Sequence, residues 1–280
     1  MTDPPSTPTQ AKIVREAAQR RPPALVHAGW ARAFPWLVQG TTTRGRAGGF
    51  DLGLFSAGSP GDQVRANWAE LAEATGFDTV VHAHQLHGSD IRVTSGGLRS
   101  TEGAGRPGEP EGSPSQLPTL LEAADGHVTD QAGVLLAVTT ADCVPVFLVD
   151  SRLRAIGVVH AGWRGVAAGI LERGLETMHG AFETRPSDVW LHLGPAICGG
   201  CYEVGPEVFE ALGQKPPARN EPIDVRSILR GRAGAAGVPA ERISVSSHCT
   251  RCTDSGLYSH RVGHAQRQVG FIGIRAADPS

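Results

Sequence analysis

Three near-continuous apolar runs in the middle of the chain restrict its fold more than any other feature. They are VLLAVTTA (residues 134–141), VPVFLVD (144–150) and AIGVVH (155–160). Apolar runs of this length, bounded by polar or turn-forming residues, are typical of strands that are covered on both faces. The chain is therefore predicted to build its core from buried strands with further layers on either side.

Helical patterns lie before and after these strands. Asp62 is expected to cap a helix that ends at Gly76. The predicted apolar face of that helix consists of Val64, Trp68, Leu71 and Ala72. Further helices are predicted in residues 166–178, 206–213 and 225–234, and further strands in 79–85, 90–95, 188–194, 243–247 and 269–275. Because strands and helices alternate only loosely, the pattern predicts an α+β or mixed α/β fold.

The beginning of the chain and one internal segment lack such patterns. Residues 1–22 are rich in Pro, Thr and Gln and are expected to form a flexible leader, without the basic and apolar regions of a secretory signal. Residues 96–119 are mostly Gly, Pro, Ser and Glu, which predicts a surface insertion. Residues 23–280 are predicted to form a single domain around that insertion.

Charge and cysteine content restrict the partners and the compartment. The chain has 26 Lys and Arg against 28 Asp and Glu without blocks of like charge, so no nucleic-acid partner is expected. The longest apolar stretch, residues 134–149, is interrupted by polar residues and proline, which argues against a membrane span. We expect a cytoplasmic protein with a small-molecule partner and no membrane partner. In a reducing compartment its five cysteines are expected to be ligands, nucleophiles or core residues rather than disulfide partners.

Cys143 and His160 flank two of the predicted strands. If residues 144–150 and 155–160 form a hairpin in which Asp150 faces Leu153, Cys143 faces His160 with Cβ atoms roughly 5 Å apart. A thiolate and an imidazole at that separation can share one zinc ion. The pair is therefore a candidate metal site or a nucleophile and base.

A catalytic zinc ion has three protein ligands and one open position, so a third ligand is needed. The segment HAHQLHGSD (residues 82–90) contains the candidates. His87 is favoured because it lies in a turn with Gln85 and Gly88, where functional residues are common, and His84 is the reserve.

The segment AGWRG (residues 161–165) follows His160 directly. Gly162 and Gly165 loosen the backbone before a helix whose first N–H groups can bind phosphate or carboxylate. Beside a Cys/His pair, this segment predicts an anion site.

Two CxxC pairs, Cys198–Cys201 and Cys249–Cys252, indicate a different site. Four such thiolates can hold a structural zinc ion. The separating segment, residues 202–248, is longer than in common zinc knuckles, so the site would have to be assembled by the fold. Packed free thiols are the alternative interpretation.

Several motifs occur in a recognisable order: HQLHG, DGHVTDQAG, TTADCVPV, HAGWRG, GPAICGGCYEVG, CT and YSHR. They resemble the YfiH or laccase-domain family, also described as the peptidoglycan editing factor and purine nucleoside phosphorylase family. The upstream GTTTRGRAGGFDLGLF resembles the start of that family, so the resemblance covers about residues 36–275. In the tail the chain departs from the family, with Arg261-Val262 in place of two arginines and Gln266-Arg267 in place of Gly-Arg.

The resemblance implies a four-layer α/β/β/α fold with mixed sheets, similar to YfiH-like cysteine hydrolases, and a single catalytic domain. It also implies a His-Cys-His zinc site, which falls on His87, Cys143 and His160, with copper as the alternative metal. The implied reactions are phosphorolysis of adenosine, inosine and methylthioadenosine, and deamination of adenosine. The expected partners are thus a purine nucleoside and phosphate.

These reactions need proton carriers and an anion site. Asp142, next to the predicted ligand Cys143, and Asp125 are the candidate proton carriers. The candidate contacts to substrate or phosphate are Arg44, Gln85, Gly162 and Arg164.

Three alternatives use the same residues differently. The first is an amidase that edits peptidoglycan precursors, either as a metallo-amidase or as a cysteine amidase in which Cys143 is the nucleophile and His160 its base. Copper-dependent oxidation of polyphenols is the second alternative. The third is a zinc-stabilised binding module without catalysis, for which loss of the metal would unfold the chain.

Overall fold

The structure is a computed structural model that describes residues 12–46, 48–95 and 117–276. Most of the predicted leader (residues 1–11) and most of the predicted insertion (96–116) lie outside the described residues. Residues 12–20, which the composition assigned to the leader, form two strands.

The described residues form two large sheets, each of seven strands. The order in the first sheet is β1 (Lys12–Val14), β15 (Ile243–Ser246), β12 (Val189–Leu193), β10 (Val144–Asp150), β11 (Ala155–Ala161), β8 (Gly126–Thr129) and β6 (Ile91–Thr94). The order in the second is β2 (Ala17–Arg20), β3 (Pro23–Val26), β4 (Leu37–Thr42), β16 (Gln268–Ile274), β9 (Val134–Thr140), β5 (Thr79–Ala83) and β7 (Thr119–Leu121). Both sheets mix parallel and antiparallel pairs, and β16, the last strand among the described residues, is the central strand of the second sheet.

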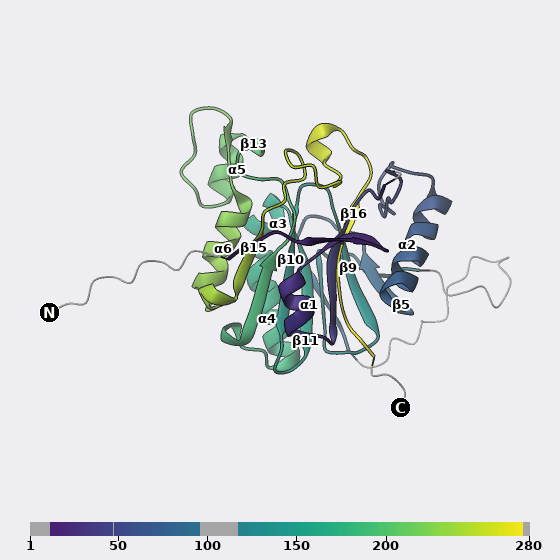
Figure 1. Ribbon diagram of the computed structural model, residues 1–280. Helices are drawn as coiled ribbons and strands as arrows, with labels where there is room; N and C mark the ends of the chain where they lie inside the picture. The colour runs from purple at the N-terminus through teal and green to yellow at the C-terminus, as the bar shows by residue number, and fades with distance from the viewer. Residues whose placement is uncertain (1–11, 47, 96–116, 277–280) are drawn as a thin grey trace.

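Helices cover the outer faces of the two sheets. The described helices are α1 (Ala28–Ala33), α2 (Gly61–Thr75), α3 (Trp163–Ala167), α4 (Ile170–Phe182), α5 (Pro206–Ala211) and α6 (Val225–Ala235). Short 3₁₀ turns occur at Pro186–Asp188, Ala240–Arg242 and His260–Val262, and β13 (Glu203–Val204) pairs with β14 (Glu221–Pro222) as a small ribbon. In Figure 1, α2 lies on one side of the paired sheets, and α4 and α6 lie on the other.

Three apolar clusters join the layers. Trp68 of α2 is buried against the second sheet, and Leu171 of α4 and Leu229 of α6 are buried against the first. Between the sheets, Phe147 of β10 belongs to one buried cluster with Leu136 of β9. The result is a four-layer α/β/β/α arrangement of the α+β class, which confirms the predicted fold.

The predicted helix that ends at Gly76 is confirmed, and its four predicted apolar residues are all buried. The prediction of its cap is wrong, because Pro60 is the N-cap residue and Asp62 lies in the first turn. Gly76 adopts a φ of 76°, the left-handed conformation in which glycine ends a helix without strain.

The strands predicted in residues 79–85 and 90–95 exist as β5 and β6, but they belong to different sheets. β5 pairs with β7 and β9, whereas β6 pairs with β8. The turn between them therefore crosses from the second sheet to the first, and it carries His87.

The hairpin of β10 and β11 is confirmed, but its predicted register is wrong by two residues. Asp150 pairs with Ala155 rather than Leu153, because the turn spans residues 151–154. The Oδ1 atom of Asp150 accepts hydrogen bonds from the backbone N–H groups of Arg152 and Leu153, which stabilises this longer turn. A shift of two residues keeps every side chain on its predicted face, so Cys143 and His160 stay on the same side of the sheet as diagonal neighbours.

Among the residues that the structure describes, no helix has both the length and the apolar character needed to cross a membrane.

Candidate metal centre

His87, Cys143 and His160 lie together where the chain passes between the two sheets. The three potential ligand atoms are all within 4.8 Å of one another. His87 lies in the turn after β5, Cys143 in the connection from β9 to β10, and His160 in β11. The reserve residue, His84, is absent from this cluster of described residues; its exposed ring stacks on Phe55 at 4.4 Å.

Asp125 connects two of these three residues. Its buried carboxylate accepts a hydrogen bond from Nδ1 of His160 at 2.9 Å and another from the backbone N–H of His87 at 2.9 Å. It also accepts the N–H groups of Leu86 and Gly88. His87 has a φ of 60°, which is uncommon for a residue with a side chain, and these hydrogen bonds hold the turn in that conformation.

The hydrogen bond to Asp125 also determines which nitrogen of His160 is available. With the proton held on Nδ1, the lone pair on Nε2 is free to bind a metal ion. A thiolate and two imidazole nitrogens are donors that suit zinc and also copper. The residues present therefore fit a bound divalent ion.

Burial and mutual attraction shift the pKa values of Cys143 and His160 in opposite directions. Burial alone raises the pKa of the Cys143 thiol, but the positive charge and hydrogen bond of His160, with a hydrogen bond from His87, lower it to about 6. Burial alone lowers the pKa of His160, but the Cys143 thiolate and Asp125 raise it to about 9. Without metal, the pair is therefore a thiolate and an imidazolium at neutral pH.

These pKa values predict how metal affinity depends on pH. A metal ion binds the thiolate and the neutral imidazole, so binding between pH 7 and 9 must displace the proton of His160. We expect the zinc affinity of the metal-free protein to rise by about tenfold per pH unit in that range, and to level off above pH 9. Competition against a chromophoric chelator at each pH measures this slope. A zinc affinity that stays constant from pH 7 to 9 would contradict the protonation states described here.

The three candidate ligand residues surround the place that a side chain at residue 162 would occupy. A Cβ atom placed on Gly162 would lie 3.0 Å from Sγ of Cys143 and 3.1 Å from Cδ2 of His87. Gly162 is the N-cap residue of the five-residue helix α3. Glycine is therefore needed here for close approach of the backbone to the cluster.

Asp142, which precedes Cys143, is held by two distant loops. Its carboxylate accepts hydrogen bonds from the Thr250 hydroxyl and from the backbone N–H of Arg261, and its carbonyl accepts one from the N–H of Ile197. Asp142 has a φ of 91°, so the connection between β9 and β10 is tightly constrained. These contacts fix the backbone that carries Cys143.

The cluster opens into a cavity of about 490 Å³. The size is in the range of small-molecule sites. Its lining includes the aromatic residues Phe55, Trp163 and Tyr202, and the basic residues Arg164, Arg261 and Arg267. Aromatic faces can stack on a planar ring, and guanidinium groups can bind an anion.

Some of the predicted substrate contacts line this cavity, and others do not. Gln85, Gly162 and Arg164 belong to its lining, as does Asp142, whereas Arg44 and Asp125 do not. Gln85 uses its side chain within the protein, because it hydrogen-bonds the backbone N–H, carbonyl and hydroxyl of Thr139. The guanidinium of Arg164 lies over the Trp163 ring at 4.4 Å and, within the described part of the chain, forms no ion pair or hydrogen bond.

Residue-by-residue reasoning missed the aromatic walls and the two arginines of the tail. Arg261 lies over the Tyr202 ring at 4.7 Å and donates a hydrogen bond to the carbonyl of Glu203. Tyr202 and Arg261 belong to two of the motifs that carry the family resemblance, GPAICGGCYEVG and YSHR, and Trp163 belongs to HAGWRG. These motifs could have indicated the three residues, whereas Arg267 lies outside all of the quoted motifs.

Comparison with known proteins agrees with the resemblance. A profile of the family described as multi-copper polyphenol oxidoreductase laccase matches residues 32–275. The chain belongs to this laccase-domain family. The members it resembles share its whole architecture rather than an isolated motif.

Three relatives show which members of the family this laccase-domain protein resembles. Purine nucleoside phosphorylase YlmD of Geobacillus stearothermophilus is 34% identical, over 88% of this chain and 95% of that protein. The crystal structure of YlmD from that organism matches with a TM-score of 0.80, 31% identity, and coverage of 93% and 99% of the two chains. The YfiH structure of Bacillus licheniformis matches with a TM-score of 0.76, 27% identity, and coverage of 91% and 97%. Adenosine deaminase RL5 of an unknown prokaryotic organism is 40% identical, over 50% of this chain and 58% of that protein.

Proposed function

We propose that this laccase-domain protein is a zinc-dependent purine nucleoside enzyme that carries out phosphorolysis and, as a second reaction, deamination of adenosine. His87, Cys143 and His160 would hold the zinc ion. The observation that carries the proposal is that these residues open into a cavity lined by aromatic and guanidinium groups. The names of YlmD and of RL5 support the choice of a purine nucleoside as the substrate.

A bound divalent ion supplies Lewis-acid polarisation and lowers the pKa of a nearby water molecule. The chain's own residues supply the rest. Phe55, Trp163 and Tyr202 offer surfaces for the purine ring. Arg164 is free to bind phosphate, because its guanidinium forms no ion pair or hydrogen bond within the described residues. The protein would act in the cytoplasm, since thiolate ligands persist in a reducing compartment.

In phosphorolysis, a phosphate oxygen forms a bond to C1′ of the ribose while the bond from C1′ to N9 of the purine breaks. The purine leaves with the bonding electrons and must gain a proton. Of the two candidate proton carriers, Asp142 belongs to the cavity lining and Asp125 does not. We therefore propose that Asp142 takes up the proton released by the attacking phosphate and passes it to the purine, and that Asp125 positions His87 and His160.

The reaction is tested by incubating the purified protein with adenosine, with and without phosphate, and separating the products by chromatography. Adenine that appears only with phosphate identifies a phosphorylase. Inosine that appears without phosphate identifies a deaminase. If neither product forms in either tube, the proposal of a purine nucleoside enzyme is wrong.

Arg164→Met is expected to raise the KM for phosphate by roughly 10- to 100-fold, because the variant loses a charge-assisted contact of about 1.5–3 kcal/mol to the anion. The KM for the nucleoside should change little. Initial rates at varied phosphate and fixed nucleoside measure the effect. Arg44→Met is the matched control, because Arg44 does not line the cavity, and an equal effect of both variants would refute the role of Arg164.

The same atoms also suit a second candidate, a cysteine amidase that edits peptidoglycan precursors. Cys143, His160 and Asp125 form a nucleophile, base and orienting carboxylate in one hydrogen-bonded series. The two candidates differ in their need for metal. Hydrolysis of a peptidoglycan precursor that survives complete removal of zinc would favour the cysteine amidase.

Copper-dependent oxidation of polyphenols, which the family description names, uses the same ligands. Two imidazoles and a thiolate are also copper ligands. Metal analysis of the purified protein, together with oxidation of a phenol after copper loading, tests this candidate directly.

A further inference from the structure

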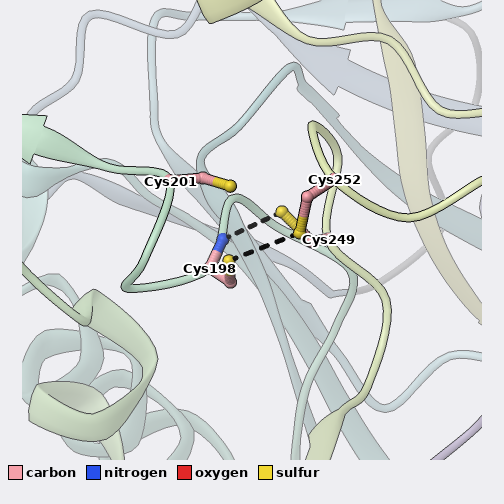
Figure 2. Close-up of side chains that lie close together, drawn as sticks. All are labelled: Cys198, Cys201, Cys249 and Cys252. Carbon is pink, nitrogen blue, oxygen red and sulfur yellow. Dashed lines mark hydrogen bonds between the residues drawn. The ribbon is translucent and has the colours of Figure 1, made fainter.

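The two CxxC pairs, far apart in sequence, come together on two neighbouring loops. The four Sγ atoms lie within 4.8 Å of one another. Figure 2 shows the side chains of both loops turned toward a common centre. The sequence pattern is compatible with a zinc site or with packed thiols, and this arrangement is the one that a zinc site requires.

The distances favour a metal over a disulfide. Two sulfurs that each lie about 2.3 Å from one tetrahedral zinc ion are about 3.8 Å apart. The Sγ atoms of Cys198 and Cys252 are 3.7 Å apart, whereas a disulfide requires about 2.05 Å. All four cysteines are free thiols in the structure.

The backbone around Cys249 is arranged to stabilise a thiolate. Its Sγ atom accepts the N–H of Cys198 at 3.2 Å and the N–H of Arg251 at 3.4 Å. The second N–H comes from the same CxxC turn, and the first comes from the other loop. Hydrogen bonds from N–H groups favour the charged form of an acceptor, which is the form that binds metal.

We propose that Cys198, Cys201, Cys249 and Cys252 bind a second zinc ion with a structural role. Four thiolates complete the tetrahedral coordination of zinc and leave no position open for water or substrate. The site is separate from the His87, Cys143 and His160 cluster, with which it shares no residue.

The proposed ion would join two loops beside the cavity, one of which contributes Ile197 and Tyr202 to the cavity lining. The loops already meet through a bridge between Ala196 and Cys249, and Arg251 donates a hydrogen bond to the carbonyl of Cys201. Thr250 of one loop and Ile197 of the other both hydrogen-bond Asp142, the neighbour of Cys143. The second zinc ion would therefore hold in place the residues that support the metal ligand Cys143.

Zinc stoichiometry of the reduced, full-length protein tests the proposal without any activity assay. We expect two zinc ions per chain by native mass spectrometry in the wild-type protein. Cys252→Ser, which changes the exposed member of the cluster, should lose one ion. Cys143→Ser is the matched control, and it should also contain one ion, held by the four cysteines.

The outcomes separate this site from the proposed active site. One ion per chain that remains in Cys143→Ser and is lost in Cys252→Ser would support the four-cysteine site and contradict the catalytic zinc. A wild-type count that Cys252→Ser leaves unchanged would overturn the four-cysteine site.

A second measurement needs no variant and stays informative if Cys252→Ser fails to fold. Wild-type protein is treated with iodoacetamide before and after addition of a zinc chelator, and each cysteine is quantified by peptide mass spectrometry. We expect the four cysteines to be protected until the chelator is added. Equal alkylation in both samples, or a disulfide between Cys198 and Cys252 in the reduced protein, would overturn the proposal.

Discussion

Cys143→Ser is expected to remove the metal ion from the cavity and to lower kcat/KM for purine nucleosides on the order of 10³-fold or more. The variant replaces the negatively charged ligand with a neutral hydroxyl of similar shape, and Lewis-acid catalysis contributes several kcal/mol to transition-state stabilisation. The fold should persist, because the large buried core does not depend on the metal. Zinc content, steady-state kinetics and circular dichroism together measure these three effects.

The control for this experiment is His179→Ala, on the exposed face of α4, which should retain both zinc and activity. His87→Ala gives an independent check, since it removes another ligand from an exposed turn. If His87→Ala unfolds the protein, the alternative of a zinc-stabilised binding module gains support. If Cys143→Ser binds as many zinc ions per chain as the wild-type protein and still loses activity, Cys143 acts as a nucleophile instead of a ligand.

Asp125→Asn is expected to weaken zinc binding at the cavity by about 10- to 100-fold, the usual effect of removing a carboxylate that orients a histidine ligand. The substitution also removes the charge that faces three backbone N–H groups and His160. The lost hydrogen bonds should lower the free energy of unfolding by about 1–3 kcal/mol. Chelator competition and urea denaturation of the metal-free protein measure the two effects.

Asp130→Asn, an exposed carboxylate on the same segment, is the matched control and should change neither quantity. A normal zinc affinity in Asp125→Asn would mean that His87 and His160 keep their positions without this carboxylate. In that case the role of Asp125 would have to be assigned again, and proton transfer would be the remaining candidate.

The buried strands and the cluster of three candidate metal ligands could be predicted because their signals are local or survive an even shift in strand register. The runs that became β9, β10 and β11 are apolar almost throughout, so their burial can be read directly. The register error at the turn of residues 151–154 had little consequence, since an even shift keeps Cys143 and His160 on one side of the sheet.

Other parts of the fold left no such local signal. β2 has the sequence AAQR, and all four residues are exposed, so nothing in it indicates a strand. The role of Asp125 depends on a turn 38 residues earlier and on a strand 35 residues later. Arg44 and Arg164 look equivalent in sequence, and only the packing of the loops decides that one lines the cavity.

The place of β16 in the second sheet has a consequence for how the cavity is assembled. This strand joins β4 to β9, although β10, β11, β12 and β15 of the first sheet lie between β9 and β16 in the sequence. Until β16 has paired, β9 lacks one of its two neighbours, and the segment leading to Cys143 is not anchored on that side. We therefore expect His87, Cys143 and His160 to come together only after this long-range pairing has closed the second sheet.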